Sequence, residues 1–138
     1  MRYINSSIRL SASDLMRFKW CRHATTLDLR YLEVGDLSPS ADSDEAELLQ
    51  KQGDAHELAF LEQLKASGRS VVEIPKDGLP LEASVELTLE AMRHGADVIF
   101  QGAFLGGPWG GYSDFLEKVE FPSDLGNWSY EVVDTKLK

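Results

Sequence analysis

Two acidic residues and one lysine near the end of the chain have a spacing suited to divalent-metal chemistry. Asp134 and Lys136 are two residues apart in the apolar stretch 130–136, so on a β-strand both side chains would leave the same face, next to Val132. Asp114 lies twenty residues earlier, in a second apolar stretch, 112–119. If these stretches are neighbouring strands, about 4.8 Å apart, their carboxylates can meet.

Paired carboxylates beside a lysine are suited to Mg²⁺ or Mn²⁺ and to phosphate. Mg²⁺ prefers oxygen ligands at ~2.0–2.1 Å and keeps several water molecules, so one or two carboxylates and a substrate phosphate complete its site. A lysine nearby can orient a water molecule or neutralise charge on the phosphate. The same Asp-x-Lys pattern is also common on solvated strand faces, so the rest of the chain has to decide between these interpretations.

Composition limits the class of protein. The 138 residues are 43% hydrophobic and 27% charged, which is typical of one soluble globular domain over residues 1–138. The absence of a long apolar run and of a secretory leader predicts a cytoplasmic protein without a membrane partner. A lone Cys21 excludes an internal disulfide. The net charge of −9 argues against strong nucleic-acid binding, unless the acids surround a metal site or a basic surface lies elsewhere.

Hydrophobic periodicity and turn residues predict an alternation of helices and strands. The predicted helices cover residues 13–31, 45–67 and 81–94, and the predicted strands cover residues 69–74, 96–105, 112–119 and 130–136. The first helix carries a basic cluster that alternates with aromatic residues, namely Arg17, Lys19, Arg22, His23 and Arg30 with Phe18, Trp20 and Tyr31. Two interpretations of this cluster are about equally supported: a solvated helix face, or a surface that contacts a nucleic-acid backbone.

The second helix contains a candidate third ligand. Gly53 destabilises a helix interior by about 1 kcal/mol, which suggests that another group passes close to it. His56 lies one turn later on the same face. A lone helical histidine is more often structural. Glu57, about 100° away around the helix, is a weaker candidate, which would hydrogen-bond to a metal ligand rather than bind the metal itself.

Several segments, taken together, resemble a known family. They are, in order, 18–28 (FxxCxHxxxLD), 53–57 (GDAHE), 88–101 (TxxAMxxGAxVIxQ), 111–116 (GYSDFL) and 130–136 (YEVVDTK). The chain therefore resembles the RecB-type nucleases of the PD-(D/E)XK superfamily, which are related to CRISPR-associated RecB-like exonucleases. The resemblance implies an α/β fold of the restriction-endonuclease-like type, with a mixed sheet flanked by helices.

The resemblance also implies a function and a site. It predicts a Mg²⁺- or Mn²⁺-dependent deoxyribonuclease with His56, Asp114 and Asp134 as metal ligands. Asp114, Asp134 and Lys136 would be the catalytic residues, and DNA would be the partner. The alternative is a non-catalytic, truncated nuclease-like scaffold that binds nucleic acid or a partner protein.

Two departures from the family pattern shape these expectations. Relatives continue past the lysine into a helix and a further strand, and commonly into an RNase H-like or helicase-type region. We therefore expect residues 1–138 to be the N-terminal portion of the domain, inactive alone if the chain truly stops there. The CRISPR-associated relatives hold an iron–sulfur cluster with one N-terminal and three C-terminal cysteines, and Cys21 alone does not support such a cluster.

Overall fold

The computed structural model describes residues 1–136, which form two compact units. One unit contains residues 1–41 and 105–111, and the other contains residues 42–104 and the chain from residue 112 onward. The contacts within each unit do not decide whether the two fold as one domain, so the expectation of a single domain stays a prediction. Each unit is described by itself below.

The first unit consists of a short hairpin and two helices. The hairpin pairs β1 (Arg2–Ile4) with β2 (Ser7–Arg9) in antiparallel fashion. Its turn residues Asn5 and Ser6 both have positive φ, as tight hairpin turns require. The carboxylate of Asp14 accepts a hydrogen bond from the backbone N–H of Ser11 at 2.7 Å, as the capping-box spacing predicts.

The prediction of one helix over residues 13–31 is wrong. The segment forms α1 (Ala12–Trp20) and α2 (Arg22–Glu33), separated by Cys21, whose backbone is extended at φ −153° and ψ 102°. The break allows the two helices to pack against each other, and Arg17 of α1 pairs with Asp28 of α2 at 2.9 Å. Apolar periodicity is helical on both sides of the break, and tertiary packing overrides it at one residue.

The second unit contains a mixed sheet between two helices. Its elements are α3 (Asp44–Ala66), β3 (Val71–Glu73), α4 (Leu81–Arg93), β4 (Val98–Phe100), β7 (Phe115–Val119) and β8 (Ser129–Val133), whereas the residues of β5 (Ala103–Gly106) and β6 (Trp109–Tyr112) are divided between the two units. Four strands form a sheet in the order β3-β4-β7-β8, in which β3 and β4 are parallel and the other pairs antiparallel. β5 and β6 form a separate pair whose tip belongs to the first unit. The fold is therefore mixed α/β, as predicted at that level.

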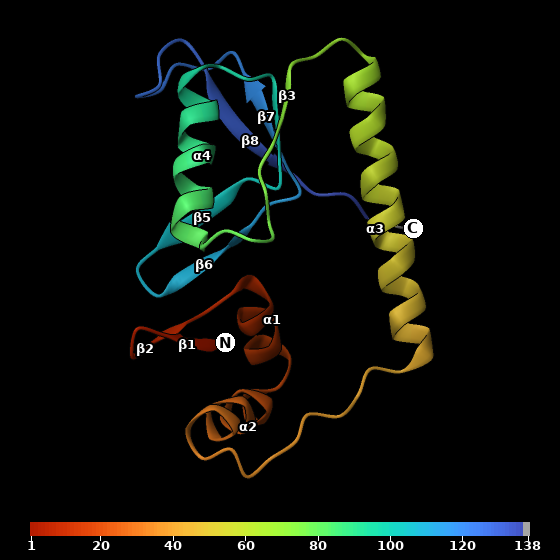
Figure 1. The fold of residues 1–138 in the computed structure, drawn as a ribbon, viewed down its shortest axis with the longest axis vertical. Helices are drawn as coiled ribbons and strands as arrows, with labels where there is room; N and C mark the ends of the chain where they lie inside the picture. The colour runs from red at the N-terminus through yellow and green to blue at the C-terminus, as the bar shows by residue number, and fades with distance from the viewer. Residues whose placement is uncertain (137–138) are drawn as a thin grey trace. The chain divides into compact units, whose positions relative to one another are not determined.

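Successive side chains of the sheet point to opposite helices. Val98 and Phe115 pack with Leu61 and Leu64 of α3, and Ile99 and Leu116 pack with Ala91 of α4. The period of two along β4 and β7 thus divides the core into two layers. In Figure 1, α3 and α4 accordingly lie on opposite sides of the sheet.

The strands that carry the candidate site are shorter than predicted. β7 begins at Phe115 rather than at residue 112, and β8 ends at Val133 rather than at residue 136. The predicted strand 96–105 is divided into β4 and β5 at Gln101, which has a positive φ of 57°. The three candidate residues therefore lie just outside the strands: Asp114 precedes β7, and Asp134 and Lys136 follow β8. The alternation of side chains along a strand does not set their directions.

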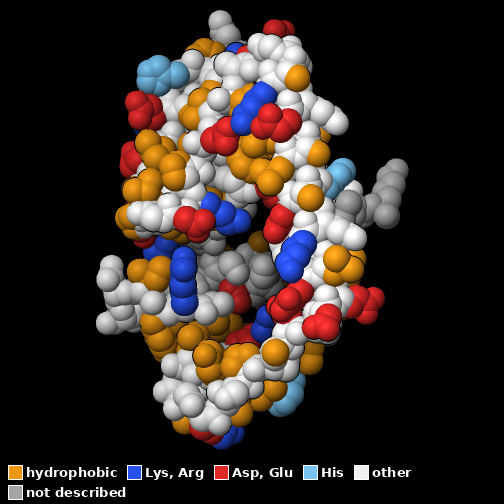
Figure 2. Space-filling view, turned by 45° about the vertical axis from the view of Figure 1, so that its right-hand side comes forward, with side chains coloured by type: hydrophobic (Ala, Val, Ile, Leu, Met, Phe, Trp, Pro, Cys, Tyr) orange, Lys and Arg blue, Asp and Glu red, His pale blue; other side chains and the backbone are white. Residues whose placement is uncertain are grey.

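Large apolar side chains remain exposed, and orange side chains reach the surface in Figure 2. One of them is Val132 on β8, which is 64% exposed on an outer strand of the four-stranded sheet.

Within residues 1–136, no helix has the length and apolar character needed to cross a bilayer.

Candidate active site

The pairing of β7 with β8 brings Asp114 and Asp134 together. Phe115 lies opposite Val133 in this antiparallel pair, Asp114 precedes Phe115, and Asp134 follows Val133. The two carboxyl groups are within hydrogen-bonding reach of each other. The prediction that the two stretches are neighbouring strands is confirmed. The carboxylates meet because the strand ends coincide, not because they share a sheet face.

Lys136 is the direct partner of Asp134. Its Nζ lies 2.8 Å from Oδ2 of Asp134, and the two side chains are 79% and 51% exposed. The hydrogen bond from Lys136 lowers the pKa of Asp134, with a further contribution from Asp114, and raises the pKa of Lys136. An ion pair this exposed contributes little to stability, so Lys136 can exchange Asp134 for another anion at small cost.

Asp114 is in the opposite electrostatic situation. The pKa of Asp114 is raised to about 6, chiefly by burial, with the hydrogen bond with Asp134 and the negative charges of Glu57 and Asp134 acting in the same direction. The backbone N–H of Thr135 donates to Oδ2 of Asp114 at 3.3 Å and opposes these effects. Asp114 therefore carries negative charge that its protein neighbours do not neutralise at neutral pH.

We expect Asp114→Asn to stabilise the metal-free protein at neutral pH and to have little effect near pH ~4. The folded state holds the Asp114 proton up to a pKa of about 6, whereas an unfolded aspartate releases it near ~3.9. The stability of the wild-type protein should therefore fall as pH rises through this window, while the amide variant is unaffected there. Because the side chain is partly exposed and screened by water, we expect a gain of only about 1 kcal/mol above pH ~7.

Urea unfolding in a chelator, from pH ~4 to ~8, measures this difference. Asp77→Asn is the matched control, because Asp77 is an exposed acid of the same unit. A stability difference between Asp114→Asn and wild type that stays the same at every pH would contradict the raised pKa of Asp114.

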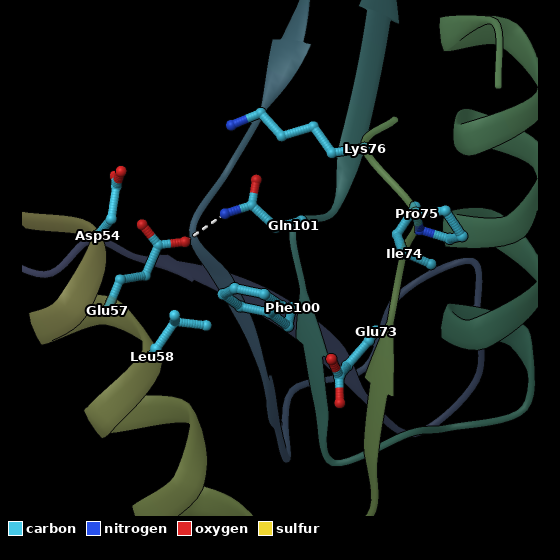
Figure 3. Close-up of a pocket in the computed structure, with 9 residues that line it drawn as sticks. All are labelled: Asp54, Glu57, Leu58, Glu73, Ile74, Pro75, Lys76, Phe100 and Gln101. Carbon is cyan, nitrogen blue, oxygen red and sulfur yellow. Dashed lines mark hydrogen bonds between the residues drawn. The ribbon is translucent and has the colours of Figure 1, made fainter. Parts of the chain in front are cut away.

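Glu57 of α3 is the second carboxylate, after Asp134, whose charge reaches Asp114. The side-chain amide of Gln101 donates to Oε1 of Glu57 (Figure 3), and the backbone N–H of Gln101 donates to the carbonyl oxygen of Asp114 at 2.9 Å. Gln101 adopts a positive φ, which is uncommon for a residue with a side chain. It thus connects α3 to the backbone at Asp114. The signal for it in the sequence is a polar residue directly after the apolar strand 98–100.

His56 is not brought into this group. It is exposed on α3. Because His56 directly precedes Glu57 in the helix, its side chain points about 100° away from that of Glu57. Within residues 1–136, no three His, Cys, Asp or Glu side chains converge as a metal-binding group. The role of His56 as a ligand stays a prediction, and Glu57 is the residue of α3 whose charge Asp114 senses.

A cleft of ≈ 540 Å³ opens beside Glu57, between α3 and the ends of β3 and β4. Figure 3 shows its lining: Asp54, Glu57, Leu58, Glu73, Ile74, Pro75, Lys76, Phe100 and Gln101. The amide of Gln101 points toward Glu57, and Lys76 extends over the opening, with its Nζ 5.8 Å from the ring centre of Tyr112. The cleft therefore combines an acidic rim, one lysine and an apolar floor that includes Phe100.

The donor set fits a hard divalent cation. Asp114 and Asp134 supply oxygen atoms at one point, and burial together with two nearby carboxylates raises the pKa of Asp114. One or two carboxylates are sufficient for Mg²⁺ or Mn²⁺, because water and phosphate oxygens complete the coordination. Asp114 and Asp134 are therefore the residues that would hold such an ion.

Comparisons with known proteins add no assignment. No family model, curated protein or solved structure matches the chain. The resemblance to RecB-type nucleases accordingly stays a prediction based on the five sequence segments and on the placement of their acidic residues.

Proposed function

We propose that the chain carries the catalytic centre of a metal-dependent deoxyribonuclease of the PD-(D/E)XK type. The observation that carries the proposal is the meeting of Asp114 and Asp134 where β7 begins and β8 ends, with Lys136 2.8 Å from Asp134. The mixed sheet between α3 and α4 is compatible with the restriction-endonuclease-like fold and supports the proposal at the level of fold class.

Each residue has a defined task in this proposal. Asp114 and Asp134 hold the cation, and Lys136 orients the attacking water molecule or neutralises charge on the scissile phosphate. A bound Mg²⁺ or Mn²⁺ would supply Lewis-acid chemistry, making water more acidic and withdrawing charge from phosphate. Water adds to phosphorus, the bond to the leaving oxygen breaks, and that oxygen takes up a proton. Glu57, oriented by Gln101, adds negative charge that favours cation binding.

A non-catalytic scaffold is the second candidate. It is favoured by the absence of a converged three-ligand group within residues 1–136 and by the acidic rim of the cleft, which would repel phosphate without a cation. In that case nucleic acid or a protein partner would bind away from the acidic rim without being cleaved, and Mn²⁺ would have no effect on stability.

Mn²⁺ should stabilise the wild-type protein and have no such effect on Asp114→Ala. Binding to the folded state alone adds about 2.7 kcal/mol when the free ion is at ~100 times its Kd. The stabilisation by Mn²⁺ has to be compared within each variant, because removing Asp114 also relieves repulsion among the acids. Thermal unfolding with Mn²⁺ or with a chelator, beside a cleavage assay on labelled DNA, tests the proposal.

The control variants separate the two residues of α3. We expect Glu57→Gln to weaken Mn²⁺ binding more than His56→Ala does, because the negative charge of Glu57 acts on Asp114. Asp77→Ala should behave like the wild type. Equal stabilisation of wild type and Asp114→Ala by Mn²⁺ would remove Asp114 from the site, and a larger loss with His56→Ala would restore the family-based ligand set.

A further inference from the structure

Trp20 is unusually exposed for an indole. It ends α1, its neighbour Cys21 has an extended backbone, and 85% of Trp20 is accessible to solvent. This is the highest value among the large hydrophobic side chains of residues 1–136. Large aromatic side chains are usually mostly buried, and exposed ones are typical of interaction surfaces. The exposure of Trp20 therefore makes it a candidate contact residue of an interaction surface.

Unneutralised positive charges flank Trp20. Lys19 precedes it, Arg22 begins α2, and both side chains are exposed. The other basic residues nearby are neutralised, since Arg17 pairs with Asp28 and Arg30 pairs with Asp36. No ion pair of Lys19 or Arg22 occurs within the described part of the chain. The guanidinium of Arg22 lies 5.5 Å from the ring centre of Phe18, which holds this cation beside the aromatic surface.

The charge of the chain is distributed unevenly. Residues 1–41 contain six Lys and Arg against four Asp and Glu, and residues 105–111 contain no charged side chain. The whole chain has 14 basic and 23 acidic residues, so the excess of acids lies entirely in the other unit. A polyanion is therefore attracted to the first unit and repelled from the second. The net charge of the whole chain argues against nucleic-acid binding, but this argument does not apply to the first unit.

We infer that the α1–α2 junction patch binds single-stranded nucleic acid. We give this name to Trp20, Lys19 and Arg22 together. Trp20 stacks on one unpaired base, and Lys19 and Arg22 contact the adjacent phosphates. Single strands fit better than a duplex, because the faces of paired bases are covered by stacking and a lone exposed indole cannot reach them. The phosphates of a single strand would pair with both cations while an adjacent base stacks on the indole. The inference goes beyond the proposed nuclease site, and the patch can bind whether or not that site is catalytic.

Fluorescence anisotropy of a labelled oligothymidine, in a chelator that prevents cleavage, tests the patch. We expect Trp20→Ala to weaken binding by roughly 5- to 150-fold and Trp20→Phe to retain most of it. The double variant Lys19→Gln/Arg22→Gln should reduce the slope of log affinity against log salt by about 1.4, because each lost phosphate contact on a single strand removes ~0.7. A duplex of the same sequence should bind more weakly than the single strand.

The controls use matched residues of the other unit. Phe121→Ala removes a side chain that is 71% exposed, and Lys51→Gln removes an exposed lysine of α3. Both variants should bind like the wild type, and the chelator, which keeps any cation out of the proposed metal site, separates this inference from the nuclease proposal. The inference is overturned if the wild type does not bind the oligonucleotide, or if Trp20→Ala binds as tightly as the wild type with an unchanged circular dichroism spectrum. It is also overturned if Phe121→Ala costs as much affinity as Trp20→Ala.

Discussion

Replacement of Lys136 by methionine should abolish most DNA cleavage and leave Mn²⁺ binding intact. Methionine keeps much of the length of the lysine stem and removes its charge and its three donors. Lys136 is 79% exposed, so the fold should not change. We expect cleavage to fall by roughly 10²- to 10³-fold, the effect of losing one electrostatic donor in the transition state. The affinity for Mn²⁺ should stay the same or rise slightly, because a nearby positive charge is gone.

The comparison requires variants that separate binding from catalysis. Asp134→Asn should lose both Mn²⁺ binding and cleavage, because it removes a ligand, whereas Lys51→Met, on α3, should lose neither. Isothermal titration with Mn²⁺ and a nuclease assay on single- and double-stranded DNA, on the same preparations, measure both properties. If Lys136→Met cleaves at the rate of the wild type, the Asp-x-Lys pair is a solvated ion pair and the nuclease proposal loses its catalytic lysine.

Replacement of Phe115 by alanine should be the most destabilising change in the second unit. Phe115 is completely buried, packs edge-on against Phe60 of α3 with ring centres 5.0 Å apart, and lies 5.1 Å from the ring centre of Phe100. Removing such a ring lowers the free energy of unfolding by about 3–5 kcal/mol, because burial is lost and a cavity remains. Phe60 is three residues from Glu57, so the site should loosen as well.

Urea unfolding measures this loss, with Phe121→Ala as the control. Phe121 is 71% exposed, so its replacement should change the free energy of unfolding by less than about 0.5 kcal/mol. If Phe115→Ala does not fold, Phe115→Leu should retain the fold with a loss of about 1–2 kcal/mol. A loss below ~1 kcal/mol for Phe115→Ala would mean that α3 does not pack on the sheet in solution.

The elements with clear boundary signals were predictable from the sequence. The predicted helices 45–67 and 81–94 agree with α3 and α4 within a residue or two. The hydroxyl of Ser43 caps the first turn of α3 by accepting from the N–H of Ala46, and Gly68 follows its end with a positive φ. Local chemistry specifies such ends, because a cap satisfies backbone groups that the helix leaves free.

The elements whose ends depend on distant contacts were not predictable. The apolar pattern continues across Cys21, and only the packing of α1 on α2 shows that the helix breaks there. The strand patterns likewise continue past Phe115 and Val133, although pairing stops at these two residues. A hydrophobic pattern reports which side chains can be buried, and the neighbouring strand decides how far the pairing extends.

The residue pattern alone predicted that the two apolar stretches around Asp114 and Asp134 pair as neighbouring strands, although both residues and Lys136 lie just outside the paired segments, and that the chain mixes helices with a sheet. Tertiary packing makes Glu57, which accepts a hydrogen bond from Gln101, the residue of α3 whose charge acts on Asp114, whereas the sequence had pointed to His56. The tertiary structure also decided that Trp20 is exposed beside two unpaired cations. The physical reason is the same in each case: spacing along a chain specifies the relative directions of side chains, whereas the rotation of a helix against its neighbours is set by packing.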